Sequence, residues 1–321
     1  MQKNTAEKAK RKSRETKTVV LQPTIVVLAT YILLLLSKII DLTLINRENE
    51  YFSVVILQMM IFLLPAAIWC RFSGDGYVSH LRLKLPALST IPLILSAAVL
   101  MITGGLLLSI LLDGLESLST NFTLYDTFIS KDKGTVTSRL YLILAYAVLP
   151  AVCEEFVYRG IVCYEYERGG VVRAVIFSSL FFGFLHFNLI NLPVYIFAGA
   201  ILALTLYSTR SLFGAMIVHF LYNLFGLFGQ PYMNALYKLS YSSGFFVFLV
   251  TLLFFLSAIA FCAQAASLYK KYLYRGYSAD YRKPVITKKE QLKASYLEVI
   301  KAPSAILCLA VYILALIIAW L

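Results

Sequence analysis

The stretch Ala151-Val-Cys-Glu-Glu-Phe-Val-Tyr-Arg-Gly160 decides the fold, because it places charged side chains in a segment otherwise typical of a membrane-spanning helix. Ionisable groups in a lipid-embedded helix cost several kcal/mol unless they are paired or solvated, so they indicate a functional site. Glu155 and Arg159 are four residues apart with the acid first, which favours a pair on one helix face. Glu154 is then left without an obvious counter-ion. A carboxylate in a poorly hydrated pocket has a raised proton affinity, which a general base working near neutral pH requires.

The composition predicts an integral membrane protein. Of the 321 residues, 60% are hydrophobic and 14% are charged, whereas soluble chains carry roughly 25% charged residues. The apolar runs are long and do not alternate, so we expect an all-α, polytopic helix bundle. The five cysteines lie in or beside these runs without a CxxC pair, which indicates buried small hydrophobes rather than disulfides or a metal knuckle.

Runs long enough to cross ~30 Å of hydrocarbon predict about nine transmembrane helices. They lie near residues 19–40, 51–70, 88–112, 139–165, 171–188, 192–208, 211–228, 244–268 and 303–321. The chain then divides into a basic cytoplasmic tail, N-terminal helices with an outer loop, a core, and C-terminal helices that include a basic inner stretch. These parts are residues 1–18, 19–134, 135–228 and 229–321, with the basic stretch at 269–302.

The net charge of +12 comes mainly from Lys and Arg that flank the apolar runs. Their distribution predicts a cytoplasmic N-terminus, an outer C-terminus and basic inner segments that bind anionic lipid. We expect a multi-pass protein of the plasma membrane. We expect residues 269–302 to form an interfacial helix, with a docking surface as the alternative. No nucleic-acid partner is expected, because no recognised module accompanies the charge. The outer loop 113–138 carries a sequon at Asn121.

Two of the three histidines, His186 and His219, lie in apolar runs, whereas His80 lies in a short inner loop beside basic residues. Gly169-Gly170 predicts a turn. The number of residues from Glu154 to this turn is almost the same as the number from the turn to His186. A folded hairpin therefore brings Glu154 and His186 to nearly the same height. His219 falls about 6 Å from that level at 1.5 Å per residue. Asn223, one turn further along the same face, closes part of the gap. We therefore expect these side chains to converge on one hydrated pocket below the bilayer midplane.

Each feature also has a purely structural interpretation. A Glu–Arg pair can lock helix packing, and a buried histidine can be a hydrogen-bonded core residue. The Phe-rich stretches are expected to pack, and the glycines at 183, 199, 214 and 226 are expected to allow close helix approach. A proton-relaying transporter would use similar residues, so the pattern predicts a polar site rather than hydrolysis in particular. Thiol catalysis by Cys153 is disfavoured, because a thiol in apolar surroundings stays protonated.

Three motifs in order resemble the CPBP family of intramembrane proteases, which includes type II CAAX-processing endopeptidases and many bacteriocin-immunity proteins. The family pattern is EExxxR, FxxxH and HxxxN. It is matched by Glu154-Glu155-x-x-x-Arg159, Phe182-x-x-x-His186 and His219-x-x-x-Asn223. The resemblance covers about residues 135–228. Tyr158 stands where many members carry Phe.

The resemblance implies hydrolysis of a peptide bond near the cytoplasmic face, in a membrane-associated, hydrophobic or lipidated peptide. Glu154 would activate the water with help from His186, and Arg159 would hold Glu155. His219 and Asn223 would steady the water or the developing oxyanion. Glu154, His186 and His219 could instead ligate zinc or another divalent metal. HExxH is absent, and metal-dependent and metal-independent hydrolysis both stay open.

Two other functions remain as alternatives. One is a proteolytically silent membrane scaffold or bacteriocin self-immunity factor. The other is a proton-coupled transporter.

Overall fold

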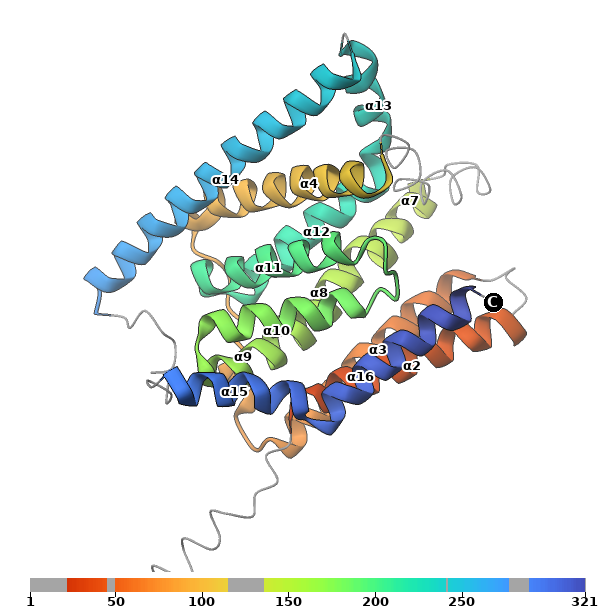
Figure 1. The fold of residues 1–321 in the computed structure, drawn as a ribbon, viewed down its shortest axis with the longest axis vertical. Coiled ribbons are helices and arrows are strands. Elements are labelled where there is room, and N and C mark those ends of the chain that lie inside the picture. The colour runs from red at the N-terminus through yellow and green to blue at the C-terminus, as the bar shows by residue number, and fades with distance from the viewer. Residues whose placement is uncertain (1–21, 45–49, 115–135, 241, 277–288, 321) are drawn as a thin grey trace, which may run out of the picture.

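A computed structural model of the chain describes residues 22–44, 50–114, 136–240, 242–276 and 289–320 (Figure 1). Within these residues the secondary structure is helical and contains no strand. The expected all-α helix bundle is therefore confirmed. Three expectations lie wholly or partly outside the described residues: the tail 1–18, most of the outer loop 113–138 with its sequon, and part of the basic stretch 269–302.

Most of the chain forms long single helices. They are α2 (Thr24–Leu44), α3 (Glu50–Phe72), α4 (Ile91–Asp113), α10 (Val171–Phe184), α11 (Leu192–Thr209), α12 (Leu212–Phe228), α13 (Gln230–Leu239), α14 (Ser243–Tyr274), α15 (Lys289–Lys301) and α16 (Pro303–Trp320). The segment before α10 is one continuous rod in which α-helical and π-helical turns alternate. Its parts are α7 (Val136–Ile143), η4 (Leu144–Val148), α8 (Leu149–Glu155), η5 (Phe156–Val162) and α9 (Cys163–Tyr166).

Five of the described helices are long and apolar enough to cross a membrane, and the count is six if the bent α15–α16 pair is one span. Each of the nine predicted runs coincides with a helix, but three of them form shorter apolar helices: Thr24–Ile39, Val171–Phe184 and Leu212–Phe228. The bundle is that of a helical membrane protein, and the number of nine spans is not confirmed. α14 also continues to Tyr274, beyond its predicted end at residue 268.

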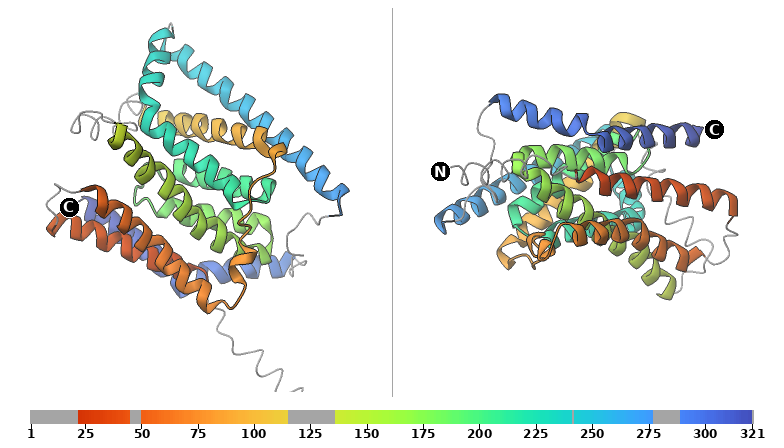
Figure 2. Two further views of the ribbon diagram at one scale, coloured as in Figure 1. Left: turned by 180° about the vertical axis from the view of Figure 1, so that it is seen from behind. Right: turned by 90° about the horizontal axis from the view of Figure 1, so that it is seen from below.

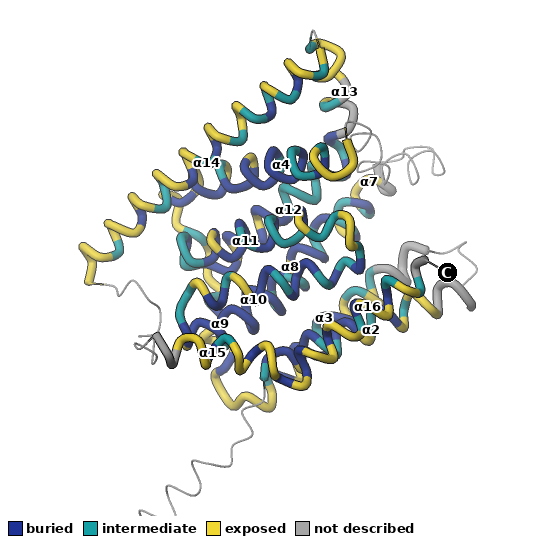
Figure 3. The backbone as a smooth tube through the Cα atoms, in the orientation of Figure 1, coloured by how far each residue is buried: buried dark blue, intermediate teal, exposed yellow. Residues whose placement is uncertain are grey.

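The helices stack in layers, and the buried residues lie in the middle layers (Figure 1). α14 lies along one edge against α4, which packs on α11 and α12. The next layer holds α10 and the α7–α9 rod. α3, α2 and α16 form the opposite edge, and the same order is seen from behind in Figure 2. Buried residues concentrate in the middle layers, whereas α14 and α16 are exposed along much of their length (Figure 3). The exposed side chains of α14 are mainly apolar, as expected of a surface facing lipid.

Glycine allows α10 and α11 to pack backbone against backbone. A Cβ atom at Gly199 would lie 2.9 Å from the Cα atom of Ser179, and one at Gly183 would lie 2.7 Å from a side-chain carbon of Ile196. The predicted close approach is confirmed at these two positions. It is wrong at Gly226, where an added Cβ would meet no atom within 4 Å.

One end of the bundle gathers basic residues. The α3–α4 connection folds over it, where Arg82 Nη2 lies 2.5 Å from Glu167 Oε2 and the Arg82 carbonyl accepts from the Leu212 amide at 3.0 Å. Tyr272 near the end of α14 donates to the Ser208 carbonyl at 3.2 Å. We call this the basic end; it carries Arg82, Lys84, Arg168, Arg210 and Lys270. The opposite end, which we call the loop end, contains the α10–α11 connection at residues 185–191.

Candidate functional site

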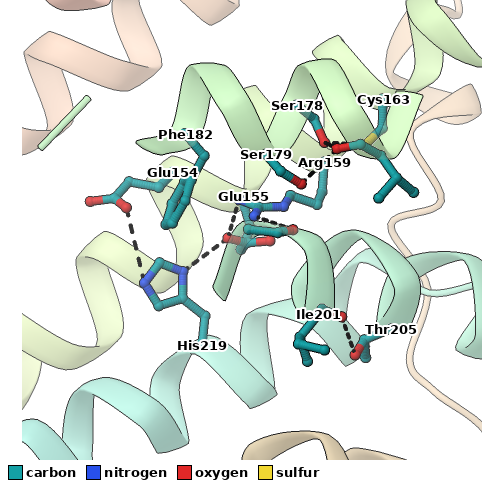
Figure 4. A network of polar contacts seen from close by, with 12 residues as sticks. Glu154, Glu155, Arg159, Cys163, Ser178, Ser179, Phe182, Ile201, Thr205 and His219 are labelled. Atoms are coloured by element: carbon teal, nitrogen blue, oxygen red, sulfur yellow. Dashed lines mark hydrogen bonds and ion pairs between the residues drawn. The ribbon is translucent and has the colours of Figure 1, made fainter. Parts of the chain in front are cut away.

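The site is built around a fully buried ion pair on the α7–α9 rod. Arg159 Nη1 lies 2.9 Å from Glu155 Oε1, and neither side chain is exposed to solvent (Figure 4). Arg159 Nη2 donates to the Gly199 carbonyl at 2.9 Å, and the guanidinium lies 4.3 Å from the centre of the Phe182 ring. The pair predicted from the four-residue spacing is therefore present, and it is tied to both α10 and α11.

His219 on α12 connects the two carboxylates. Its Nδ1 atom is 2.9 Å from Glu155 Oε1, and its Nε2 atom is 4.0 Å from Glu154 Oε2 (Figure 4). An ionised carboxylate can only accept, so Nδ1 carries the hydrogen in the first contact and Nε2 faces Glu154. A separation of 4.0 Å is too long for a direct hydrogen bond and suits a bridging water.

Phe182 is the common packing partner of the site. Besides the Arg159 guanidinium, its ring contacts His186 and His219, with centroid separations of 5.1 and 5.8 Å. The Tyr158 ring lies nearly perpendicular to it, with a centroid separation of 5.5 Å. The Phe-rich stretch was expected to pack, as it does. The FxxxH motif places this ring four residues before His186.

His186 lies beyond the end of α10, in the α10–α11 connection. Its Nδ1 atom is 3.1 Å from the Phe182 carbonyl, which can only accept, so Nε2 is left as the free lone pair. The ring stacks on Tyr195 with a centroid separation of 3.8 Å. Among the described residues, His186 forms no hydrogen bond or ion pair with Glu154. Tyr195 was not identified from the sequence, and no motif pointed to it.

The other polar candidates differ in their surroundings. Asn223 is half-buried one turn beyond His219 on the same face of α12. His80 is exposed at the basic end and stacks on Tyr164, as expected for a histidine outside the site. Cys153 is buried with 1% exposure, in keeping with a packing role.

The rod changes its helical type at the site. α8 ends at Glu155 and the π-helical segment η5 begins at Phe156, so the ion pair straddles the change. π-Helical turns are rare and concentrate at functional sites. No sequence pattern indicated this irregularity.

The donors of this site do not make up a set that fits a metal ion. Glu155 is engaged by Arg159 and His219, which leaves Glu154 and the Nε2 atom of His219 facing each other. Across the described ranges, no group of three or more His, Cys, Asp or Glu side chains could hold a metal ion. Catalytic zinc uses three protein ligands, so this arrangement does not fit such an ion. Metal ligation by Glu154, His186 and His219, which the resemblance implied, would need His186 to join the other two side chains, and the mechanism proposed for this chain uses no metal.

Comparison with known proteins gives one family. Residues 136–225 match the family model described as type II CAAX prenyl endopeptidase Rce1-like. The match runs from the start of α7 into α12 and includes Glu154, Glu155, Arg159, His186, His219 and Asn223. No curated protein and no solved structure matches the chain.

Proposed function

We propose that this membrane protein is an intramembrane endopeptidase, because residues 136–225 match the family model of type II CAAX prenyl endopeptidases, a family of intramembrane proteases. Its substrate is a hydrophobic or membrane-associated peptide, and the protein resides in the plasma membrane with its N-terminus in the cytoplasm. One observation carries the proposal. Arg159 contacts Glu155, Glu155 contacts His219, and His219 faces Glu154, whose side chain is half-buried.

Glu154 acts as the general base. A water molecule held between Glu154 Oε2 and His219 Nε2 attacks the carbonyl carbon of the scissile bond while its proton passes to Glu154. Glu154 then gives that proton to the amide nitrogen as the C–N bond breaks, which yields a carboxylic acid and an amine. Such proton transfer contributes about 10²–10⁴-fold to a rate.

The neighbouring groups hold His219 and set the charge of the site. Glu155 accepts from Nδ1 and fixes the ring, and Arg159 fixes Glu155. Two carboxylates and one guanidinium leave one negative charge, which a single proton shared by Glu154 and His219 neutralises. A neutral buried cluster avoids the cost of an unpaired charge. With that proton on Nε2, His219 donates to the developing oxyanion, and Asn223 supplies a second donor from the next turn.

The substitution Glu154→Gln tests the base. The assay uses two internally quenched apolar peptides in detergent, one of them farnesylated on a cysteine near its carboxyl end. We expect cleavage by the wild type and a loss of about 10²–10⁴-fold in the variant, with an unchanged unfolding temperature. Glu165→Gln on the same rod is the matched control, because Gln still accepts the 2.8 Å hydrogen bond from Tyr77.

Cleavage by a folded Glu154→Gln variant at the wild-type rate would remove Glu154 from this role. A wild-type protein that cleaves neither peptide would favour the silent scaffold or immunity factor. Complementation of a deletion strain by the Glu154→Gln variant would strengthen that conclusion. Uptake driven by a pH gradient in liposomes, without any cleaved product, would favour the transporter.

A further inference from the structure

A separate cavity of about 240 Å³ lies between α4, the start of α11 and the last turns of α12. Its lining is largely apolar with a few polar groups, which is the usual composition of a ligand pocket. The residues that line it are Ile102, Gly105, Leu106, Ser109, Asn191, Val194, Tyr195, Tyr222, Phe225 and Gly226.

This cavity adjoins the proposed catalytic site through two helices. On α11, Tyr195 lines the cavity and stacks on His186 at 3.8 Å between ring centroids. On α12, His219, Tyr222 and Gly226 follow one another at spacings of three and four, so they lie on one helix face over two successive turns. A peptide bound at Glu154 can therefore extend along this face into the cavity.

One residue that lines the cavity, Asn191, carries an unsatisfied acceptor. Asn191 Oδ1 is buried and has no hydrogen-bond partner within the described part of the chain. The backbone groups of Asn191 are occupied: its amide donates to Asn188 Oδ1 at 3.0 Å, and its carbonyl accepts from the Tyr195 amide at 3.1 Å. A buried acceptor without a donor costs about 1–3 kcal/mol. A backbone N–H of an extended peptide is a donor that would satisfy it.

We propose that this cavity is the substrate subsite that selects one large apolar side chain beside the scissile bond, while Asn191 Oδ1 accepts a hydrogen bond from the substrate backbone. The inference rests on the proposed function. The volume suits one side chain rather than a whole lipid, because pockets for drug-sized ligands begin at about 300 Å³.

Gly226 offers a direct test, because an added Cβ there meets no atom within 4 Å and a larger side chain would fill the cavity. Two quenched peptides that differ by Leu or Ala at one position, scanned across the cleavage site, measure the preference. We expect the wild type to prefer Leu at one position. Gly226→Leu should reduce the Leu-to-Ala ratio of kcat/KM by about tenfold or more. Gly244→Leu, at the exposed start of α14, is the matched control.

Asn191 is tested by a pair of substitutions. Asn191→Leu removes the acceptor and should lower kcat/KM for both peptides by about tenfold, whereas Asn191→Asp keeps an acceptor and should retain most of the activity. If Asn191 had only a structural role, the two folded variants would have similar kcat/KM values.

A binding measurement keeps the subsite distinct from the catalytic proposal. The Glu154→Gln protein is irradiated with an apolar peptide that carries photo-leucine, and the adducts are mapped by mass spectrometry. We expect adducts within residues 191–195 or 222–226, and their loss when Gly226→Leu is added. If the wild type cleaves nothing, the proposed function fails while these adducts still test the cavity. Adducts confined to other helices, or an unchanged Leu-to-Ala ratio in a folded Gly226→Leu variant, would overturn the subsite.

Discussion

Removing the Arg159 guanidinium should destabilise the protein far more than neutralising Glu154. The substitution Arg159→Met leaves the unexposed Glu155 carboxylate with His219 as its remaining partner. It also removes the hydrogen bond to the Gly199 carbonyl and the contact with the Phe182 ring. Breaking a buried pair by removing one member costs about 3–5 kcal/mol. For a chain of this size that loss corresponds to a fall in Tm of about 10 °C.

Replacing both partners should cost much less. Glu155 Oε2 and Arg159 Nε are buried without a hydrogen-bond partner among the described residues, so the pair does not fully recover its desolvation energy. Apolar replacement of a whole buried pair is often neutral or stabilising by about 1–4 kcal/mol. The double variant Glu155→Met/Arg159→Met should therefore regain most of the lost stability. It should stay inactive, because His219 Nδ1 has lost its acceptor.

Thermal unfolding of the purified variants in one detergent measures this double-mutant cycle, with peptide cleavage as the second readout. Arg168→Met is the control, because Arg168 pairs with Glu165 at 3.2 Å but its side chain is 55% exposed. An exposed pair contributes about 0–1 kcal/mol. An Arg159→Met variant no less stable than this control would show that the buried pair is not what holds Glu155. A double variant less stable than both single ones would contradict the expected recovery.

Three further outcomes follow from the structure. Chelators should leave cleavage unchanged, and metal analysis of the active protein should find less than one equivalent; activity lost to a chelator and restored by zinc would contradict this. Gly199→Val should lower the unfolding free energy by about 1–3 kcal/mol, because its Cβ would meet the Ser179 backbone at 2.9 Å; an unchanged Tm would contradict this. At the basic end, a cavity of about 520 Å³ lined by apolar groups with Arg210 and Lys270 should retain phosphatidylglycerol over phosphatidylcholine in native mass spectrometry. Replacing both cations by Gln should weaken that retention by about 1 kcal/mol per charge, and equal retention would argue against lipid selection there.

The parts of the fold that depend on local spacing were predictable from the sequence. Long apolar runs gave the helices, because each run must satisfy its own backbone in lipid. The Glu155–Arg159 pair followed from a spacing of four on one helix face. The close approach at Gly199 followed from the absence of a side chain.

Contacts between distant helices were not predictable in the same way. Glu155 and His219 are 64 residues apart, and their 2.9 Å contact depends on how α8 and α12 cross. The height estimate for His186 assumed a helix that continues through this residue. α10 ends at Phe184, so the chain turns before His186 and its ring stacks on Tyr195 instead.

The location of His186 also bears on the side from which substrate enters. α10 has 14 residues, so about 21 Å separate its start at the basic end from Phe184. Towards the basic end the site is closed by the unexposed Glu155 and Arg159, whereas Glu154 and His186 are half-buried. The resemblance implied a site near the cytoplasmic face, yet the excess of Lys and Arg assigns the basic end to the cytoplasm. These two expectations conflict for this fold. We follow the distribution of Lys and Arg, because it is a property of this chain's own residues.

We therefore expect the loop end to face outward and the substrate to enter from that side. In a Cys262→Ser background, a membrane-impermeant maleimide should label Leu189→Cys in intact cells, because Leu189 is 59% exposed at the loop end. Ser79→Cys, exposed at the basic end, should react after permeabilisation. The reverse pattern would place the basic end outside and return the site to the cytoplasmic side. The subsite at Gly226 and the base at Glu154 would be unaffected by that result, because neither assignment depends on the direction of the bundle in the membrane.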